Sequence, residues 1–260
     1  MFRLSKHCFL LYNTLQKGSV KMENRYASRI EKVQMSSIRV VMEKVEKLRS
    51  QGKSVVSLCA GEPDFNTPEG IKKATIEALN DNQTHYSSNR GYLGLRKKVA
   101  HLLKEQTTID YDSDTEIIMT CGCSEAINNV CQAFINKDDE VIIFTPAFVS
   151  YQNTVLLCQG IPVEIPLKLS LGFQIDIEEV KNKITKKTKM IILNNPNNPT
   201  GAVYQKETLE QLCKLARENN ILILADEIYN QLDYENQYVS IASFENMKDY
   251  TIIVNGFSKA

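Results

Sequence analysis

Thr251-Ile252-Ile253-Val254 is a short apolar run, and Asn255-Gly256-Phe257-Ser258-Lys259-Ala260 follows it as a loop of mainly small residues that holds one lysine. A lone lysine in such a loop is ordinarily a solvated surface charge. Here the same arrangement, an apolar run followed by a polar loop, recurs along the chain. The six runs are 116–119, 141–144, 163–166, 190–193, 221–224 and 251–254.

Amphipathic segments separate several of these runs. Apolar side chains recur every three or four residues over 124–136 and over 206–219, which is the spacing of a helix. Short, fully apolar strands that alternate with helices indicate a mainly parallel sheet covered on both faces. The predicted fold class is therefore α/β, with three α/β/α layers around a mainly parallel sheet. No Gly-x-Gly-x-x-Gly follows any run, which argues against a dinucleotide-binding Rossmann site.

The part of the chain before this alternation contains three predicted helices and one predicted strand. Apolar residues at helical spacing predict a helix over 37–51. The run 55–58 predicts a strand, and Thr67-Pro68 predicts the start of a second helix, with the proline at its first position. A loop with two glycines, 86–94, precedes a third helix that extends through Leu103.

The composition excludes several classes of function. The 31 basic and 31 acidic residues give zero net charge, so no electrostatic argument favours nucleic acid or an anionic membrane as a partner. No apolar run approaches the length of a membrane span. The seven cysteines match neither a zinc site nor a disulfide framework. Reduced thiols in a cytoplasmic compartment are the expectation.

The first residues differ in character from the rest. Residues 1–21 contain four basic residues and no acidic residue, around an apolar cluster at 8–12. This composition is compatible with a mitochondrial transit peptide. The alternative is a disordered leader over 1–23, with translation starting at Met22.

Polar groups and small residues follow the predicted strands at their carboxyl ends, where ligands bind in sheets of this kind. After the first run, residues 120–126 form a small-residue turn that opens a helix. Backbone N–H groups there could bind a phosphate, although Ser124 could equally be an ordinary N-cap. After the second run, Phe148 is an aromatic residue at a strand end, a position more often occupied by core residues.

The later strand ends carry more distinctive groups. Residues 194–201 include four asparagines and two prolines, which make an irregular loop with side-chain amides to spare; a binding role and a plain connector are both open. Asp226 directly follows a buried run, so its charge requires a partner there. Tyr229 follows three residues later, and Lys259 lies after the last run.

Four motifs together carry a family resemblance. They are GEPDF at 61–65, NNPNNPTGAVY at 194–204, ADEIY at 225–229 and NGFSKA at 255–260. In this order and spacing they resemble the class I/II aminotransferases, which are pyridoxal-phosphate enzymes of the aspartate aminotransferase superfamily with fold type I. The resemblance extends from about Asn24 to the last residue.

This resemblance implies roles for the residues at the strand ends. Lys259 would form the Schiff base with the cofactor aldehyde and then serve as general base and acid, for which the amine must be neutral. Asp226 would pair with the pyridine nitrogen and keep it protonated, so that the ring acts as an electron sink. Tyr229 would hydrogen-bond the 3-oxygen of the ring. Asn198 would share that oxygen and reach the α-carboxylate of the substrate.

Further positions match the cofactor and substrate contacts of the family. Phe148 matches the aromatic residue that stacks on the pyridine, where tryptophan or tyrosine is more usual. Cys123 lies in the phosphate-binding turn, where glycine or serine is common. The other matches are Gly122 and Ser124 in the same turn, Tyr86, which would reach the phosphate of a neighbouring subunit in a homodimer, and Gly61, whose backbone would contact the substrate.

The resemblance also implies a domain organisation and a reaction. Residues 24–66 would pack with a small domain, and residues 67–260 would be an incomplete cofactor-binding large domain. Family members continue past the lysine with a phosphate-binding arginine, a further strand and a substrate-binding small domain, so a truncated product is expected. The implied reaction transfers an amino group from an amino acid to a 2-oxo acid. The alternatives are a carbon–sulfur lyase, an aminocyclopropane-carboxylate synthase, or an inactive isoform.

Overall fold

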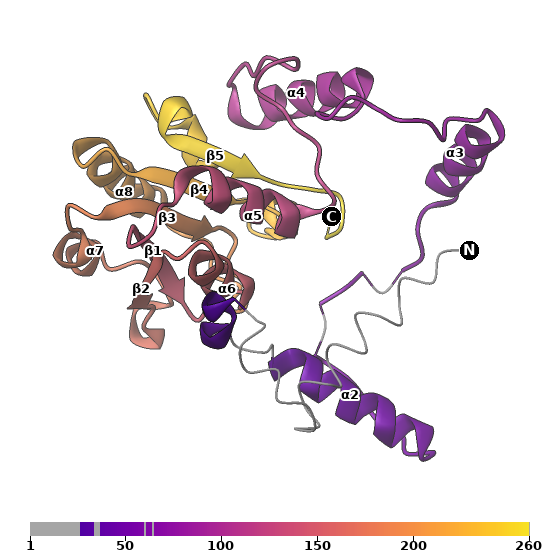
Figure 1. Ribbon diagram of the computed structural model, residues 1–260, viewed down its shortest axis with the longest axis horizontal. Helices are drawn as coiled ribbons and strands as arrows, with labels where there is room; N and C mark the ends of the chain where they lie inside the picture. The colour runs from indigo at the N-terminus through magenta and orange to yellow at the C-terminus, as the bar shows by residue number, and fades with distance from the viewer. Residues whose placement is uncertain (1–26, 34–36, 60, 64, 260) are drawn as a thin grey trace. The chain divides into compact units, whose positions relative to one another are not determined.

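The computed structural model describes residues 27–33, 37–59, 61–63 and 65–259 (Figure 1). Contacts divide the chain into Met1–Val33 and Gln34–Ala260. In the first unit, a short 3-10 helix, η1, spans Ser28–Lys32. The predicted leader, Asp64 of the first motif and Ala260 of the last motif lie outside the described residues.

The second unit contains a five-stranded sheet in which all four strand pairs are parallel. The strand order is β2-β1-β3-β4-β5, and Figure 1 shows β5 in yellow at one edge. Five of the six predicted apolar runs are therefore confirmed as strands. They are β1 Glu140–Thr145, β2 Ile161–Pro166, β3 Thr188–Asn194, β4 Leu222–Asp226 and β5 Thr251–Val254.

The sheet separates two hydrophobic cores, because successive residues of a strand point to opposite faces. On β1, Val141 and Ile143 pack into one core, whereas Ile142 and Phe144 pack into the other. The first core includes residues of α5 (Cys123–Phe134) and α6 (Ser150–Leu157). The second includes residues of α7 (Ile177–Lys183) and α8 (Lys206–Glu218). The predicted three-layer α/β/α fold is thus confirmed.

Two predicted strands are absent from the described part of the chain. The run 116–119 forms no strand and pairs with none of the five strands, and Ile118 is 61% exposed. Residues 55–58 form no strand either, and Val56 and Leu58 are 87% and 92% exposed. Both predictions were wrong for the same reason: an apolar run becomes a strand only where a neighbouring backbone completes its hydrogen bonds.

Three helices precede α5, as predicted. They are α2 (Ser37–Ser50), α3 (Glu69–Asn80) and α4 (Leu93–Thr107). Helix α3 begins one residue later than predicted, so that Pro68 occupies the N-cap position. Short 3-10 helices η2 (Leu169–Leu171), η3 (Asn230–Leu232), η4 (Ile241–Ser243) and η5 (Lys248–Tyr250) complete the elements. Among the described residues, no helix combines the length and apolarity needed to cross a membrane.

Candidate active site

Asp226 is the central acidic group at the carboxyl end of the sheet. It is the last residue of β4 and is only 4% exposed. One carboxylate oxygen accepts a hydrogen bond of 2.6 Å from the Tyr151 hydroxyl, and the other accepts one of 3.2 Å from the Ile228 N–H. Burial raises the pKa of Asp226, while these two donors lower it. No lysine, arginine or histidine within the described residues forms an ion pair with this carboxylate.

The asparagine loop after β3 is tied to this strand end. The Asn194 side chain donates to the Asp226 carbonyl oxygen at 2.9 Å and accepts from the Asn198 N–H at 2.7 Å. The Asn198 amide then donates to the Tyr229 hydroxyl at 3.1 Å. Because Asn194 is buried, its two bonds fix the loop against β4. The structure therefore brings Asn198, Asp226 and Tyr229 together.

Tyr229 is held as a neutral hydrogen-bonding group. Burial, followed by the charge of nearby Asp226, raises its pKa, although the bond from Asn198 lowers it. The residue is partly exposed, and Asn198 is the hydrogen-bond partner of its hydroxyl. A protonated phenol beside an amide can donate to an anionic oxygen of a ligand.

The turn before α5 leaves the start of the helix without a side-chain cap, and its Cys121 N–H donates to the Glu125 carboxylate. Gly122 is the N-cap, with φ of 79°, and no side chain caps the helix. Ser124 lies inside the helix, so the interpretation of Ser124 as an ordinary N-cap was wrong. Helix N–H groups without a cap are donors for an anion. Burial, with the charge of Asp226, raises the pKa of the Cys123 thiol to about 11, so this side chain adds no negative charge to the turn.

Lys259 lies in the loop after β5 and makes one contact with a distant part of the chain. Its ammonium donates to the Gly61 carbonyl oxygen at 2.7 Å. In the same loop, a Cβ atom placed on Gly256 would lie 3.3 Å from the sulfur of Cys123. The lysine loop therefore passes directly beside the start of α5, and two predicted site residues that are 198 positions apart are in contact.

Sequence reasoning missed two residues that organise the site, Tyr151 and Asn194. Tyr151 packs edge-on against Phe148, with ring centroids 5.6 Å apart and an angle of 82° between the planes. The available signals were weak: Tyr151 lies about one helical turn beyond Phe148, and Asn194 is the first polar residue after a buried run. Phe148 itself is half-buried at the end of β1, where the sequence placed it.

Tyr86 is the predicted site residue that stands apart. Its side chain is fully exposed and borders an open surface depression, which it shares with Ser88, Tyr92 and Thr120. No hydrogen bond joins it to another predicted site residue in the described part of the chain. The depression nevertheless extends to Thr120, two residues before Gly122.

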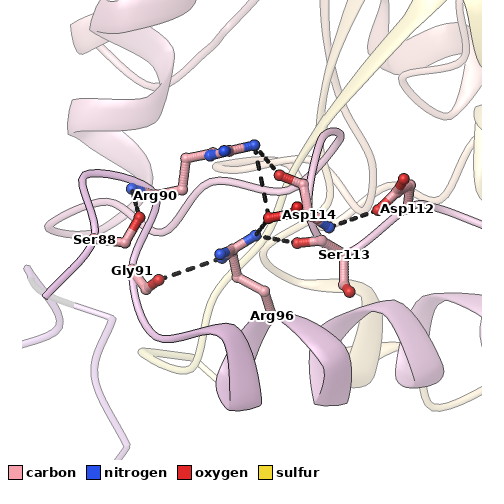
Figure 2. A network of polar contacts seen from close by, with 7 residues as sticks. All are labelled: Ser88, Arg90, Gly91, Arg96, Asp112, Ser113 and Asp114. Atoms are coloured by element: carbon pink, nitrogen blue, oxygen red, sulfur yellow. Dashed lines mark hydrogen bonds and ion pairs between the residues drawn. The ribbon is translucent and has the colours of Figure 1, made fainter.

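A network of polar contacts holds the loop that follows Tyr86 (Figure 2). Arg96 is 3% exposed, and its guanidinium donates to the backbone oxygens of Gly91 and Ser113. It also lies 3.4 Å from the Asp114 carboxylate. Gly91 has φ of 86°, and an added Cβ would come within 2.7 Å of Met119. The loop therefore contains a turn that requires glycine at position 91.

Comparison with known proteins matches the chain to one family. Residues 53–260 match the model of the aminotransferases of class I and II. A probable aspartate/prephenate aminotransferase of Aquifex aeolicus is 38% identical over 92% of this chain and 61% of its own length. An aspartate aminotransferase of Pyrococcus abyssi is 43% identical over 80% of this chain and 54% of its own length.

Solved structures give the same match. The aspartate aminotransferase of Thermus thermophilus with maleate superimposes with a TM-score of 0.86 at 38% identity, covering 90% of this chain and 60% of that protein. That of Thermotoga maritima gives a TM-score of 0.87 at 35% identity, covering 90% and 62%. The chain thus spans less than two thirds of the length of these relatives.

Proposed function

Since the chain belongs to the class I and II aminotransferase family, we propose that it transfers an amino group from an amino acid to a 2-oxo acid with pyridoxal phosphate as cofactor. Members of this family use that cofactor. Several of the relatives are named as aspartate aminotransferases and one as an aromatic-amino-acid aminotransferase, so aspartate and aromatic amino acids are the first donors to test.

The observation that carries the proposal is the buried Asp226 carboxylate, which no cation of the described residues neutralises. A buried anion is stable only when it is paired and hydrogen-bonded. Tyr151 and Ile228 provide two hydrogen bonds but no positive charge. A protonated pyridine nitrogen would supply both a donor and a charge. The residues present therefore fit the ring of the cofactor.

The remaining groups fit the other parts of the same cofactor. Asn198 and Tyr229 would hold an anionic ring oxygen, and Phe148 would cover a face of the ring. The uncapped start of α5, with Gly122, Cys123 and Ser124, would hold the phosphate. When bound, pyridoxal phosphate supplies an aldehyde for amines and a ring that withdraws electrons from the substrate Cα.

The protein groups then have separate tasks. Lys259 would provide the amine that attaches the cofactor and would move the proton at the substrate Cα, with Gly61 beside its ammonium as a substrate contact. Asp226 would keep a proton on the ring nitrogen. Asn198 would also orient the α-carboxylate of the substrate.

Assembly and domain organisation are part of this proposal. Residues 67–260 would be the cofactor-binding large domain and residues 24–66 the segment that packs with a small domain. We propose a homodimer for the whole protein, with the exposed Tyr86 reaching the phosphate of the second subunit. The six described cysteines are free thiols, which supports a reducing compartment such as the cytoplasm, with the mitochondrial matrix as the alternative.

The test is cofactor attachment followed by amino transfer. The chain is mixed with pyridoxal phosphate, reduced with borohydride and mapped by mass spectrometry beside Lys259→Ala and Lys214→Ala. Lys214 is an exposed lysine of α8 and serves as the matched control. The cofactor mass should appear on Lys259 in the wild type and in Lys214→Ala. Its absence from Lys259 would refute the proposal.

Amino transfer is distinguished from lyase chemistry by the requirement for an acceptor. Consumption of the amino donor should depend on added 2-oxo acid. Without an acceptor, amino transfer can consume only one equivalent of donor per bound cofactor, so consumption beyond one equivalent would instead indicate lyase chemistry at the same site.

A further inference from the structure

Tyr151 is a buried polar residue that the proposed chemistry leaves without a role. It is the second residue of α6 and is 2% exposed, packed in the core beneath α5 and α6. Its hydroxyl contacts Asp226, which is 75 positions away in the sequence, at 2.6 Å. A bond this short between a hydroxyl and a carboxylate is typical of a charge-assisted hydrogen bond.

The direction of this hydrogen bond is fixed by the surroundings. Burial, followed by the charge of Asp226, raises the pKa of Tyr151 well above its ordinary value. Tyr151 therefore remains protonated and donates. The other titratable groups that interact with Asp226 are Tyr229 and Glu227, which follow β4, and Cys123 at the start of α5; none of them carries a positive charge.

Tyr151 also connects two parts of the site through its ring. The ring packs edge-on against Phe148, the aromatic side chain at the end of β1. The hydroxyl and the Ile228 N–H bind different oxygens of the same carboxylate, so together they fix its rotation. Each oxygen retains a further lone pair for a ligand.

We propose that Tyr151 is a positioning residue that keeps Asp226 ionised and oriented toward the ring nitrogen of the bound cofactor. This inference rests on the proposed function and deepens it. Without the hydroxyl, the buried carboxylate would take up a proton more readily and would pair less well with a protonated ring nitrogen. Tyr151 thus acts through Asp226 and need not touch the ligand.

The test compares two ligands that differ only at the ring nitrogen. Dissociation constants are measured by equilibrium dialysis for pyridoxal phosphate and for its analogue with carbon in place of that nitrogen. The wild-type chain should bind the nitrogen-containing ligand more tightly. Tyr151→Phe keeps the ring that packs in the core and should lower this preference about tenfold, as expected for loss of one hydrogen bond to a charged group.

Two variants complete the design. Tyr111→Phe is the matched control, because the Tyr111 hydroxyl is buried and has no hydrogen-bond partner among the described residues; its ligand preference should equal that of the wild type. Tyr151→His keeps a ring N–H donor and should keep a preference above that of Tyr151→Phe. Circular dichroism verifies that each variant is folded.

The outcomes distinguish a failure of the Tyr151 inference from a failure of the proposed function. Equal weakening of both ligands in Tyr151→Phe would mean that Tyr151 only supports packing, and a Tyr151→His preference as low as that of Tyr151→Phe would also overturn the inference. If the wild-type chain binds neither ligand, the proposed function itself fails and the inference fails with it.

Discussion

Glu227 gives the sharpest test of the fold at the end of β4. It directly follows Asp226 and is 3% exposed. Its carboxyl group accepts a hydrogen bond of 2.7 Å from the Ser240 hydroxyl, and its N–H donates to the Val254 carbonyl oxygen at 2.8 Å. Burial raises the pKa of Glu227 to about 7, from an ordinary value of 4.5. The Ser240 hydrogen bond opposes this shift without cancelling it.

The sign and size of the effect follow from that shift. The native chain holds the proton more tightly than the unfolded chain, so this group stabilises the fold fully below pH 4.5 and loses that contribution as pH rises through 7. A difference of about 2.5 pKa units corresponds to about 3 kcal/mol. Glu227→Gln removes the ionisation while keeping the shape of the side chain. Between pH 5 and pH 8, the unfolding free energy of the variant should therefore fall by about 2.5 kcal/mol less than that of the wild type.

The assay is urea unfolding followed by circular dichroism at pH 5, 6, 7 and 8. The difference in unfolding free energy between wild type and variant isolates Glu227 from the other titrating groups. Glu245→Gln, an exposed acid in the same region, is the control and should follow the wild-type curve. Parallel pH dependence in the wild type and Glu227→Gln would refute the reasoning.

Three further predictions concern the framework of the site, each measured by chemical unfolding. Asn194→Ala should lower the unfolding free energy by about 1–3 kcal/mol, because it removes the acceptor of the Asn198 N–H and leaves the Asp226 carbonyl oxygen with the Asn195 N–H as its remaining donor; a change below 0.5 kcal/mol would contradict this. Gly91→Ala should cost about 1–3 kcal/mol, since the new Cβ meets Met119 at a positive φ; unchanged stability would count against the turn geometry. Arg96→Met should cost about 1–3 kcal/mol, because it removes the donor to the half-buried backbone oxygens of Gly91 and Ser113, and unchanged stability would contradict the role of Arg96 in the network of Figure 2.

Most of the sheet could be predicted from the sequence because its strands are short, apolar and separated by helices. The incorrect strand predictions at 55–58 and 116–119 have a nonlocal cause. Both runs have the composition of strands, but no neighbouring strand pairs with them in the described structure. Composition specifies which segments can pair, whereas pairing depends on a second segment elsewhere in the chain.

The site could be predicted to a similar extent, and the prediction of its residues was incomplete for a similar reason. Asp226 was found because it directly follows a buried run, Asn198 and Tyr229 were assigned from the family resemblance, and the structure brings the three together. Tyr151 was missed because it is buried on a helix and its partner is 75 positions away. No local pattern distinguishes such a tyrosine from an ordinary core residue.

The end of β4 places two buried acids in succession, and their neighbours differ. Asp226 meets Tyr151 on α6, whereas Glu227 meets Ser240 just before η4. Because consecutive residues of a strand point in opposite directions, one peptide unit separates a carboxylate suited to a ligand from a carboxyl group that responds to pH. Substitutions around Ser240 would therefore change the pH response of the fold through Glu227, while Asp226 on the other side keeps its own partners.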